Sequence, residues 1–462
     1  MSVLLIAAFV VRVVYVESTH YKALNDAGTY NRMASMISQF GDYHTGSGPR
    51  SGAGGSQGPT AYFPPAFPYF LAVVDLIDGH EAGGKTAVPP ERIAQAMIGT
   101  VSVGLLGLVA LEAFGGGAAM AALAIAAVYP VFVELSGALV AENLLLVFEL
   151  AAIWTVLRAG RAARTWTMYL WIAAAGVLVG LATLTHENAA LFVLPLGVAA
   201  WSAARARAQQ GPPRSRPGLR AAAGPAVLVV CMCVAIAPWT IRNAVELHHF
   251  VPVSDETGIT LIGTYNAESA AFSPVPYKWK LFSKIPEFKP ITHVSSRYTE
   301  VELSDLLQSR ALDYIRAHPW SPFDVAFHNT LRMLEIEGTY AWHASAAALS
   351  LPADTAEVGV ISFWALCALA LAGVFTAAGR AAPRWLWAFP LLYAISIVFV
   401  NVETPRFREP IDPFLILLAA CAVNAAAQRL LRLGGPPVRR RRRAPELAGN
   451  DAELVKMVQR LP

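Results

Sequence analysis

Residues 221–239 read AAAGPAVLVVCMCVAIAPW, a run of nineteen residues without a charged side chain. A transmembrane helix needs about 20 mostly apolar residues, so this run is long enough to be read as one. The composition of the 462-residue chain agrees, because 55% of its residues are hydrophobic and 15% are charged. Soluble domains have roughly 45–50% and about 25%. The chain is therefore predicted to be a polytopic membrane protein, and an ordinary soluble enzyme is excluded.

Similar apolar runs recur along the whole chain. The first of them begins almost at the initiator methionine and carries Arg12, so we expect no cleaved signal peptide. The predicted fold is all-α, with about ten transmembrane helices over Val3–Val16, Ile93–Phe114, Ala118–Phe132, Leu139–Leu157, Met168–Thr185, Ala189–Ser202, Ala221–Trp239, Val358–Ala378, Trp385–Val400 and Ile411–Ala427.

The arginines between the apolar runs predict the orientation, since basic loops stay in the cytoplasm. With ten spans, four basic segments fall on one side: Arg158 to Arg164, Arg205 to Arg220, Arg380 to Arg384, and Arg439 to Arg443. Counting Phe67–Ile77 as an eleventh span would move three of these segments outside. We therefore interpret Phe67–Ile77 as a helix at the outer interface, opened by prolines 64, 65 and 68.

Two segments are too long to be simple connectors and are expected to face outward. Residues 17–91 form a first external loop with a Gly/Ser-rich, flexible stretch at Gly46–Gly58. Residues 241–357 form an external segment before the last three spans. There, Thr299 and Glu302 have capping-box spacing, and the helix they open should stop at Pro319. The predicted parts are a membrane module at 1–240, the external segment at 241–357, C-terminal spans at 358–428 and a basic cytoplasmic tail at 429–462.

The distribution of charge and of cysteines argues against nucleic-acid binding and against a disulfide framework. The net charge is +4, and the basic residues lie in loops, so no nucleic-acid partner is expected. The four cysteines all lie within apolar runs, where we interpret them as small core residues rather than a disulfide framework.

Charged and polar residues gather where the predicted helices meet the outer side. Charged residues at helix ends often only snorkel to the interface. Eight of them on one side, with both signs present, favour a shared polar cavity instead. They are Arg12, Asp26, Glu142, His186, Glu187, Arg242, Arg406 and Arg408.

Several short motifs resemble those of the GT-C superfamily of membrane glycosyltransferases, and they occur in that superfamily's order. The resemblance is greatest to its protein-mannosyltransferase and aminoarabinose-transferase branch and covers nearly the whole chain. The matching stretches are Asn25–Tyr30, with the D-x-x-x-Y pattern, then Tyr62–Pro68, Ser136–Glu142, Gly180–His186, Pro238–Asn243, Ala311–Pro319 and Pro405–Arg408.

The resemblance implies an inverting glycosyltransferase of the cell envelope, which moves a hexosyl or pentosyl group from a polyprenyl monophosphate to an acceptor hydroxyl. Such a reaction needs a base for the hydroxyl. Asp26 is the predicted base, with Tyr30 in support, and Glu142 is the predicted second carboxylate. The competing interpretation makes Asp26 an N-cap of the helix that contains Tyr30.

The departing phosphate also needs compensating charge, which arginine supplies through a planar, bidentate guanidinium. The candidates for donor-phosphate binding are Arg242, Arg406 and Arg408, with Arg12 as a supporting residue. Their alternative is snorkelling, or pairing with the local acids Glu403 and Glu409. His186 stands where the superfamily usually has Lys or Arg, which predicts a weaker or pH-dependent phosphate contact.

The sequence leaves several points open. A divalent ion between Asp26, Glu142 and a phosphate is compatible with these residue types, yet some branches of the superfamily work without metal. The predicted partners are the lipid-linked donor, an unidentified acceptor and the bilayer of the cytoplasmic membrane, with the active site on its outer face. The alternative function is a transporter or flippase, which would need polar residues reachable from both sides. A scaffold protein would leave the acid and arginine set unexplained.

Overall fold

The fold is seen in a computed structural model that describes residues 1–44, 58–79, 89–210 and 217–434. Over these ranges the chain is helical, and the only β-pairing is an isolated bridge between His44 and Pro59. Residues Met1–Asn424 form one compact unit, which is described below, and Ala425–Pro462 form a second. The predicted all-α class is confirmed. The predicted flexible stretch Gly46–Gly58 and the basic tail lie largely outside the described residues.

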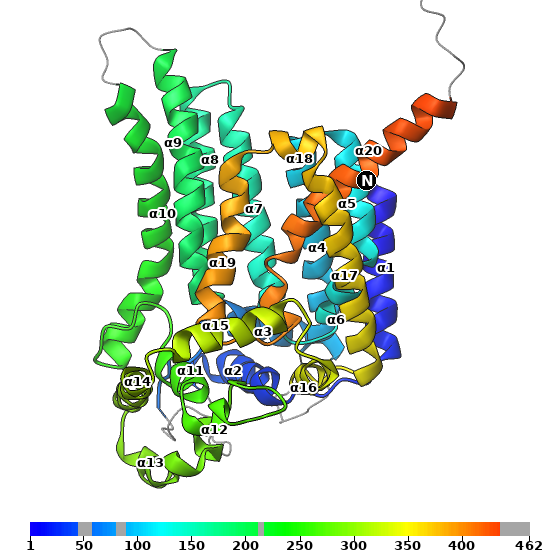
Figure 1. The fold of residues 1–462 in the computed structure, drawn as a ribbon. Helices are drawn as coiled ribbons and strands as arrows, with labels where there is room; N and C mark the ends of the chain where they lie inside the picture. The colour runs from blue at the N-terminus through cyan, green and yellow to red at the C-terminus, as the bar shows by residue number, and fades with distance from the viewer. Residues whose placement is uncertain (45–57, 80–88, 211–216, 435–462) are drawn as a thin grey trace, which may run out of the picture. The chain divides into compact units, whose positions relative to one another are not determined.

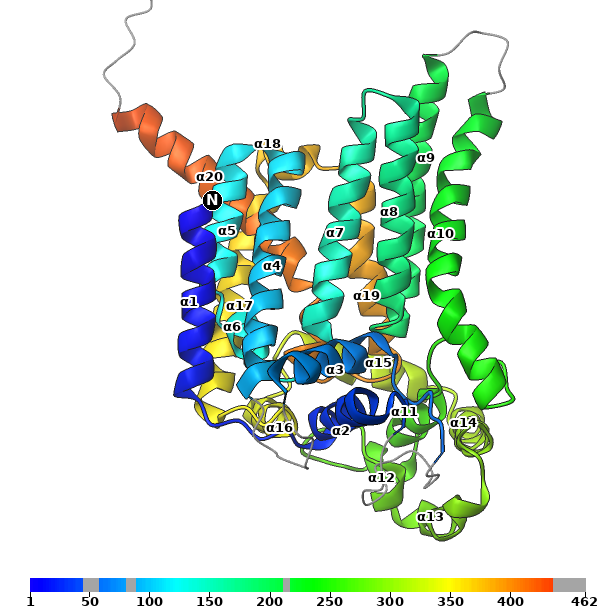
Figure 2. The same cartoon turned by 180° about the vertical axis from the view of Figure 1, so that it is seen from behind.

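Apolar helices run side by side as a bundle in the first unit (Figures 1 and 2). Nine of the predicted spans correspond to one helix each, and the span predicted at Ala118–Phe132 corresponds to two. The helices are α1 (Ser2–Ser18), α4 (Pro89–Phe114), α5 (Gly116–Val128), α6 (Pro130–Ser136), α7 (Glu142–Gly160), α8 (Thr165–Thr183), α9 (Val193–Gln209, after the 3-10 turn Glu187–Phe192), α10 (Pro217–Glu246), α17 (Ala353–Val374), α19 (Ala388–Val398) and the part of α20 (Asp412–Gly434) that belongs to this unit.

Length and apolarity qualify seven of these helices, in the described residues, to cross a membrane, or eight if α5 and α6 together make one broken span. Helix α1 has 17 residues and α19 has 11. Both lie beside longer helices (Figure 1). A helix packed against longer neighbours can be shorter than the bilayer thickness and still span it. The predicted total of ten spans remains a prediction.

The span predicted at Ala118–Phe132 is instead two helices, α5 and α6, which meet at an angle of 55°. Pro130 explains the break because it has no N–H to donate to the carbonyl of Ala126. The Arg12 guanidinium takes over this role: it donates to the carbonyls of Ala126 and Ala127, each at 3.2 Å, and to the Ser136 hydroxyl. Arg12 is completely buried. Its predicted place on the outer aqueous face is therefore wrong, and it holds the broken helix together.

Shorter helices from two distant parts of the sequence gather at one end of the bundle (Figures 1 and 2). The first loop contributes α2 (Asn25–Phe40) and α3 (Ala66–Asp78). The long segment before α17 contributes α11 (Thr257–Thr264), α12 (Ala267–Ala270), α13 (Lys289–Val294), α14 (Glu300–Ala317), α15 (Ser321–Met333) and α16 (Thr339–Ala348). Residues 158–164 and 380–384, two of the arginine-bearing loops, lie at the opposite end.

Two local predictions are confirmed in this region. Helix α3 covers Phe67–Ile77 and lies across the end of the bundle rather than along it (Figure 2). Helix α14 begins with the predicted capping box, because Thr299 and Glu302 exchange side-chain and backbone hydrogen bonds. It ends at Ala317, just before Pro319.

The segments 17–91 and 241–357 are hydrogen-bonded to each other. Glu300, buried at the start of α14, accepts hydrogen bonds from the Thr60 hydroxyl at 2.5 Å and the Ala61 amide at 2.8 Å. The Arg242 guanidinium, on the last turns of α10, donates to the carbonyls of Thr60 and Tyr43 at 2.8 and 3.2 Å. These contacts fix the segment of the first loop that leads into Pro64 and α3.

Candidate active site

The centre of the candidate site is an arginine that joins two carboxylates from distant parts of the chain. Arg406 Nε donates to Glu142 Oε1 at 2.6 Å, and its Nη1 donates to Asp26 Oδ2 at 2.7 Å. Burial alone would lower the pKa of Arg406, but the two carboxylates outweigh it and hold that pKa above its ordinary value. The guanidinium therefore stays charged, and three of the predicted residues are in direct contact.

Asp26 is the accessible member of this trio, since half of its side-chain surface is exposed. It lies in the first turn of α2, where the N-cap residue is Leu24 and no side chain caps the helix. The interpretation of Asp26 as an N-cap is therefore wrong. Tyr30, one turn later, is buried with its ring 4.5 Å from that of Phe63 and 5.0 Å from that of Phe67. This packing anchors the turn that presents Asp26.

Glu142 is the buried member. It opens α7 and has no exposed surface. Its Oε1 is bonded to Arg406, while Oε2 has no hydrogen-bond partner in the described structure. A buried carboxylate with one satisfied oxygen depends on its cation. Glu142 is thus well placed to orient Arg406, whereas Asp26 is the carboxylate that a substrate can reach.

A further carboxylate, Glu256, was not identified from the sequence. It is the residue before α11, and burial, followed by the charges of Glu187 and Asp26, raises its pKa well above the ordinary value. Glu187 itself accepts a hydrogen bond from the Ser254 hydroxyl at 2.7 Å. The segment 241–357 therefore adds the carboxyl group of Glu256 to the surroundings of Arg406. No periodicity or motif marks Glu256, because its position depends on how 241–357 folds back.

His186 lies near the same centre, with its ring 6.1 Å from that of Phe407 and 6.2 Å from that of Tyr393. Burial lowers its pKa below the ordinary value, although the Glu142 carboxylate opposes this effect. The imidazole is therefore neutral near pH 7. It can offer a hydrogen bond to a phosphate, but it does not supply the positive charge that Lys or Arg would bring to this position.

Arg408, two residues after Arg406, belongs to a different network. Its Nη1 donates to Glu335 Oε1 at 2.6 Å, and its Nε lies 3.2 Å from Asp412 Oδ1. All three side chains are buried. The guanidinium also lies over the Phe363 ring, 3.6 Å from its centre. These contacts are typical of a structural brace, and its predicted role in phosphate binding remains a prediction.

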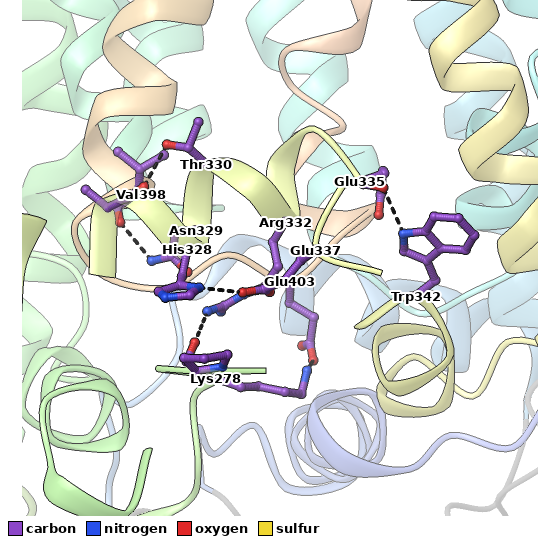
Figure 3. Close-up of polar contacts among 12 residues, drawn as sticks. Lys278, His328, Asn329, Thr330, Arg332, Glu335, Glu337, Trp342, Val398 and Glu403 are labelled. Carbon is purple, nitrogen blue, oxygen red and sulfur yellow. Dashed lines mark hydrogen bonds and ion pairs between the residues drawn. The ribbon is translucent and has the colours of Figure 1, made fainter. Parts of the chain in front are cut away.

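The local acids do not pair with these arginines as the alternative interpretation expected. Glu403 is 3.4 Å from the ammonium group of Lys278, as Figure 3 shows. Glu409 is completely buried, and neither of its carboxylate oxygens has a hydrogen-bond partner in the described structure. Burial raises the pKa of Glu409 well above its ordinary value, which favours the neutral form of this side chain.

Arg242, the third predicted phosphate ligand, donates hydrogen bonds to backbone carbonyls of the first loop. Its guanidinium also stacks over the rings of Trp239 and Tyr43, at 4.9 and 5.5 Å from their centres. The structure thus brings Asp26, Glu142 and Arg406 together, with His186 nearby. Arg12, Arg242 and Arg408 each have their own sets of partners.

The described residues contain no group of three or more His, Cys, Asp or Glu side chains arranged like metal ligands. Asp26 and Glu142, the pair suggested by the sequence, are both bonded to Arg406. These two carboxylates would therefore give a divalent ion at most two protein ligands. Phosphate oxygens and water would have to supply the others.

The family model that matches the chain is described as dolichyl-phosphate-mannose-protein mannosyltransferase, and it matches residues 63–236. This range contains Glu142 and His186 but neither Asp26 nor Arg406. No curated protein matches the sequence.

Similar solved structures include two of the oligosaccharyltransferase of Archaeoglobus fulgidus. One carries a tethered acceptor peptide with the NVT sequon (15% identity, TM-score 0.52). The other is a complex with Zn and sulfate (16% identity, TM-score 0.50). Each match covers 93% of this chain but 50% of the archaeal one. A third is ArnT from Cupriavidus metallidurans bound to undecaprenyl phosphate, at 16% identity, with 95% of this chain and 81% of that chain covered and a TM-score of 0.42.

The family-model match and the fold shared with the archaeal structures confirm the predicted resemblance to the GT-C superfamily. At such low identity the structural matches show the fold, and the chain spans about half the length of the archaeal enzyme. What the individual enzymes bind or transfer does not follow from the fold.

Proposed function

From its GT-C-type membrane fold, we propose that this protein is an inverting glycosyltransferase that uses a polyprenyl-phosphate sugar as donor and works on the outer face of the cytoplasmic membrane. The observation that carries the proposal is the Asp26–Arg406–Glu142 trio. It combines a half-exposed carboxylate, a guanidinium that stays charged and a buried carboxylate. A sugar transfer from a phosphate needs the first two of these groups, a base and a cation.

The proposed reaction is a single displacement. Asp26 accepts the proton of the acceptor hydroxyl while that oxygen forms a bond to the anomeric carbon. The bond from this carbon to the phosphate oxygen breaks, and its electron pair leaves with the polyprenyl phosphate. Attack from the side opposite the phosphate inverts the anomeric centre.

Arg406 has the complementary role. Its Nε and Nη1 are held by Glu142 and Asp26, so the guanidinium plane is fixed before the substrate arrives. We assign Nη2, the third nitrogen, to an oxygen of the donor phosphate. A prepositioned charge stabilises the developing negative charge without reorganisation during the reaction.

The test is transfer of labelled sugar from a panel of synthetic polyprenyl-phosphate sugars, in membranes that contain the parent protein or its Asp26→Asn variant. Label transfer by the parent, lost in the variant, identifies the donor and supports the proposal. If the parent transfers no sugar from any donor but moves the lipid-linked sugar across the bilayer, the protein is a flippase and the proposal fails.

The outer-face assignment has its own test, because the external segments and the basic loops lie at opposite ends of the bundle. A single cysteine at the exposed Ser309 of α14 should react with an impermeant thiol reagent in intact cells. One at the exposed Gln209, at the end of α9, should react only after the membrane is permeabilised. The reverse pattern would place the site in the cytoplasm.

A further inference from the structure

Helix α15 buries polar side chains and exposes apolar ones, which is the reverse of a helix on the surface of a soluble domain. The side chains that point into the protein include Asn329, completely buried, and Arg332, also buried. Those that point outward include three aromatic side chains: Trp320, the N-cap residue, is 74% exposed, Phe323 61% and Phe327 60%. The exposed Asp324 and Thr330 flank them. At 100° per residue these three, together with Leu331 and Leu334, form one narrow stripe opposite the buried face.

The buried polar face is explained by its partners, which Figure 3 shows. Asn329 Nδ2 donates to the carbonyl of Val398 at 2.7 Å, one of the carbonyls left unpaired where α19 ends. Arg332 Nε donates to Glu337 Oε2 at 2.6 Å, and His328 Nδ1 lies 2.9 Å from Glu337 Oε1. The inner face is therefore polar because it caps and braces neighbouring backbone. No comparable partner within the described chain covers the aromatic stripe.

The depth of α15 follows from its contact with a membrane-spanning helix. Trp364 Nε1 donates to the carbonyl of Leu334, next to the end of α15, at 2.9 Å. Trp364 is in the middle of the candidate span Asp354–Val374 and is itself 41% exposed. The C-terminal end of α15 thus lies level with apolar surface that a span presents to lipid.

Exposed apolar side chains lie on both sides of this hydrogen bond. Leu334 and Ile336 follow α15, and on α17 the exposed Ile361 lies almost one turn before Trp364. Exposed apolar side chains that gather in this way mark an interaction site. Aromatic side chains, tryptophan above all, are enriched where a protein meets the boundary between headgroups and acyl chains.

We propose that α15 is an interfacial helix whose Trp320, Phe323 and Phe327 face is embedded in the acyl region of the bilayer, in the leaflet nearest the external segments. The helix lies across the bundle, in front of α19 (Figure 1). It inserts its apolar stripe into lipid, while its polar face holds the protein.

The same helix is bonded to the loop that carries the central arginine of the candidate site. Besides the bond from Asn329 to Val398, Arg408 Nη1 donates to the carbonyl of Met333 at 3.3 Å and to Glu335. Embedding α15 in lipid therefore fixes both ends of the loop from Val398 to Arg408 relative to the bilayer. The inference concerns the membrane contact alone and does not depend on the proposed reaction.

The test uses the full chain in nanodiscs that hold one copy each, with Cys231, Cys233, Cys367 and Cys421 replaced by alanine. A nitroxide spin label is placed at Phe323→Cys or Phe327→Cys, with Ser309→Cys on the exposed side of α14 as the matched control. Collision with oxygen, which concentrates in lipid, is compared with collision with a water-soluble nickel chelate. Chromatographic elution as a single parental peak shows that each variant is folded.

We expect the labels at positions 323 and 327 to collide at least several-fold more with oxygen than with nickel, and the label at 309 to show the reverse. Greater nickel collision at 323 and 327 would overturn the proposal, because the stripe would face water. Protection from both agents would also overturn it, since a single copy would then bury the stripe against protein or a bound lipid-linked donor.

Discussion

Arg406 and Arg408 are separated by one residue, yet they occupy two different electrostatic environments. Arg406 joins the buried Glu142 to Asp26, whose side chain is half exposed. Arg408 joins Glu335 and Asp412, and this whole network is buried. Both arginines are paired with two carboxylates at similar nitrogen–oxygen distances, so the difference between them is the exposure of a partner carboxylate. An ion pair that substrate can reach is suited to catalysis, and a sealed one is suited to holding the fold together.

The largest expected effect is a loss of stability when the buried network around Arg408 is broken. Arg408→Met leaves the Glu335 and Asp412 carboxylates buried without their cation, which typically costs about 3–5 kcal/mol. We expect most of the variant to aggregate or to lose its elution peak after mild heating in detergent. The matched control is Arg380→Met, at an exposed arginine of α18 (Ala377–Ala381), whose stability should stay near parental. An Arg408→Met protein as stable as the parent would remove the distinction between the two networks.

A smaller effect, on activity rather than stability, is expected at Arg406. Arg406→Lys keeps the charge but cannot donate to Glu142 and Asp26 from two fixed nitrogens. The kcat/KM for the donor should fall at least about tenfold, which corresponds to about 1.4 kcal/mol. Initial rates over a range of donor concentrations measure this change.

Arg242→Lys is the comparison variant, because Arg242 donates to backbone carbonyls of the first loop. It should reduce protein stability more than it changes the KM for the donor. If Arg406→Lys were as active as the parent while Arg242→Lys lost donor binding, the phosphate site would have to move to Arg242.

The smallest expected effect is a pH dependence near Arg406. Burial lowers the pKa of His186 in the folded chain, so the unfolded chain binds its proton more readily as the pH drops below about 6.5. The stability linked to His186 is thus fully present above that pH and is lost as the pH falls. Thermal inactivation at pH 7.5 and 5.5 should show a smaller acid sensitivity in His186→Gln than in the parent. Equal acid sensitivity would mean that His186 is already protonated or exposed.

The sequence predicted what depends on local pattern and missed what depends on long-range packing. Apolar runs, the prolines before α3 and the capping box at Thr299 act within a few residues, so their helices were found. The pairing of Arg406 with Asp26 joins residues 380 positions apart. The predicted topology and the resemblance to the GT-C superfamily suggested that both belong to one site, but neither predicted their direct contact. Nothing local indicated that Glu335 is the partner of Arg408.

Two errors have the same physical origin. Arg12 was placed on the aqueous face because it falls near the outer end of the first predicted span, but its guanidinium is buried against the carbonyls of a broken helix. Glu256 was not considered, since an acidic residue in a long polar segment has no distinguishing pattern. In both cases the deciding partner comes from a different element of the fold.

The most direct test of sugar transfer at the Arg406 centre is the Asp26→Asn substitution. Asparagine preserves the volume of Asp26 but cannot accept the proton of the acceptor hydroxyl. We expect the transfer rate to fall by a factor of about 10² or more, with expression and detergent stability near parental. Asp313→Asn, at an exposed acid on α14, is the control and should be fully active. An Asp26→Asn protein that transfers sugar at the parental rate would contradict the assignment of Asp26 as the base and leave Glu142 as the next carboxylate to test.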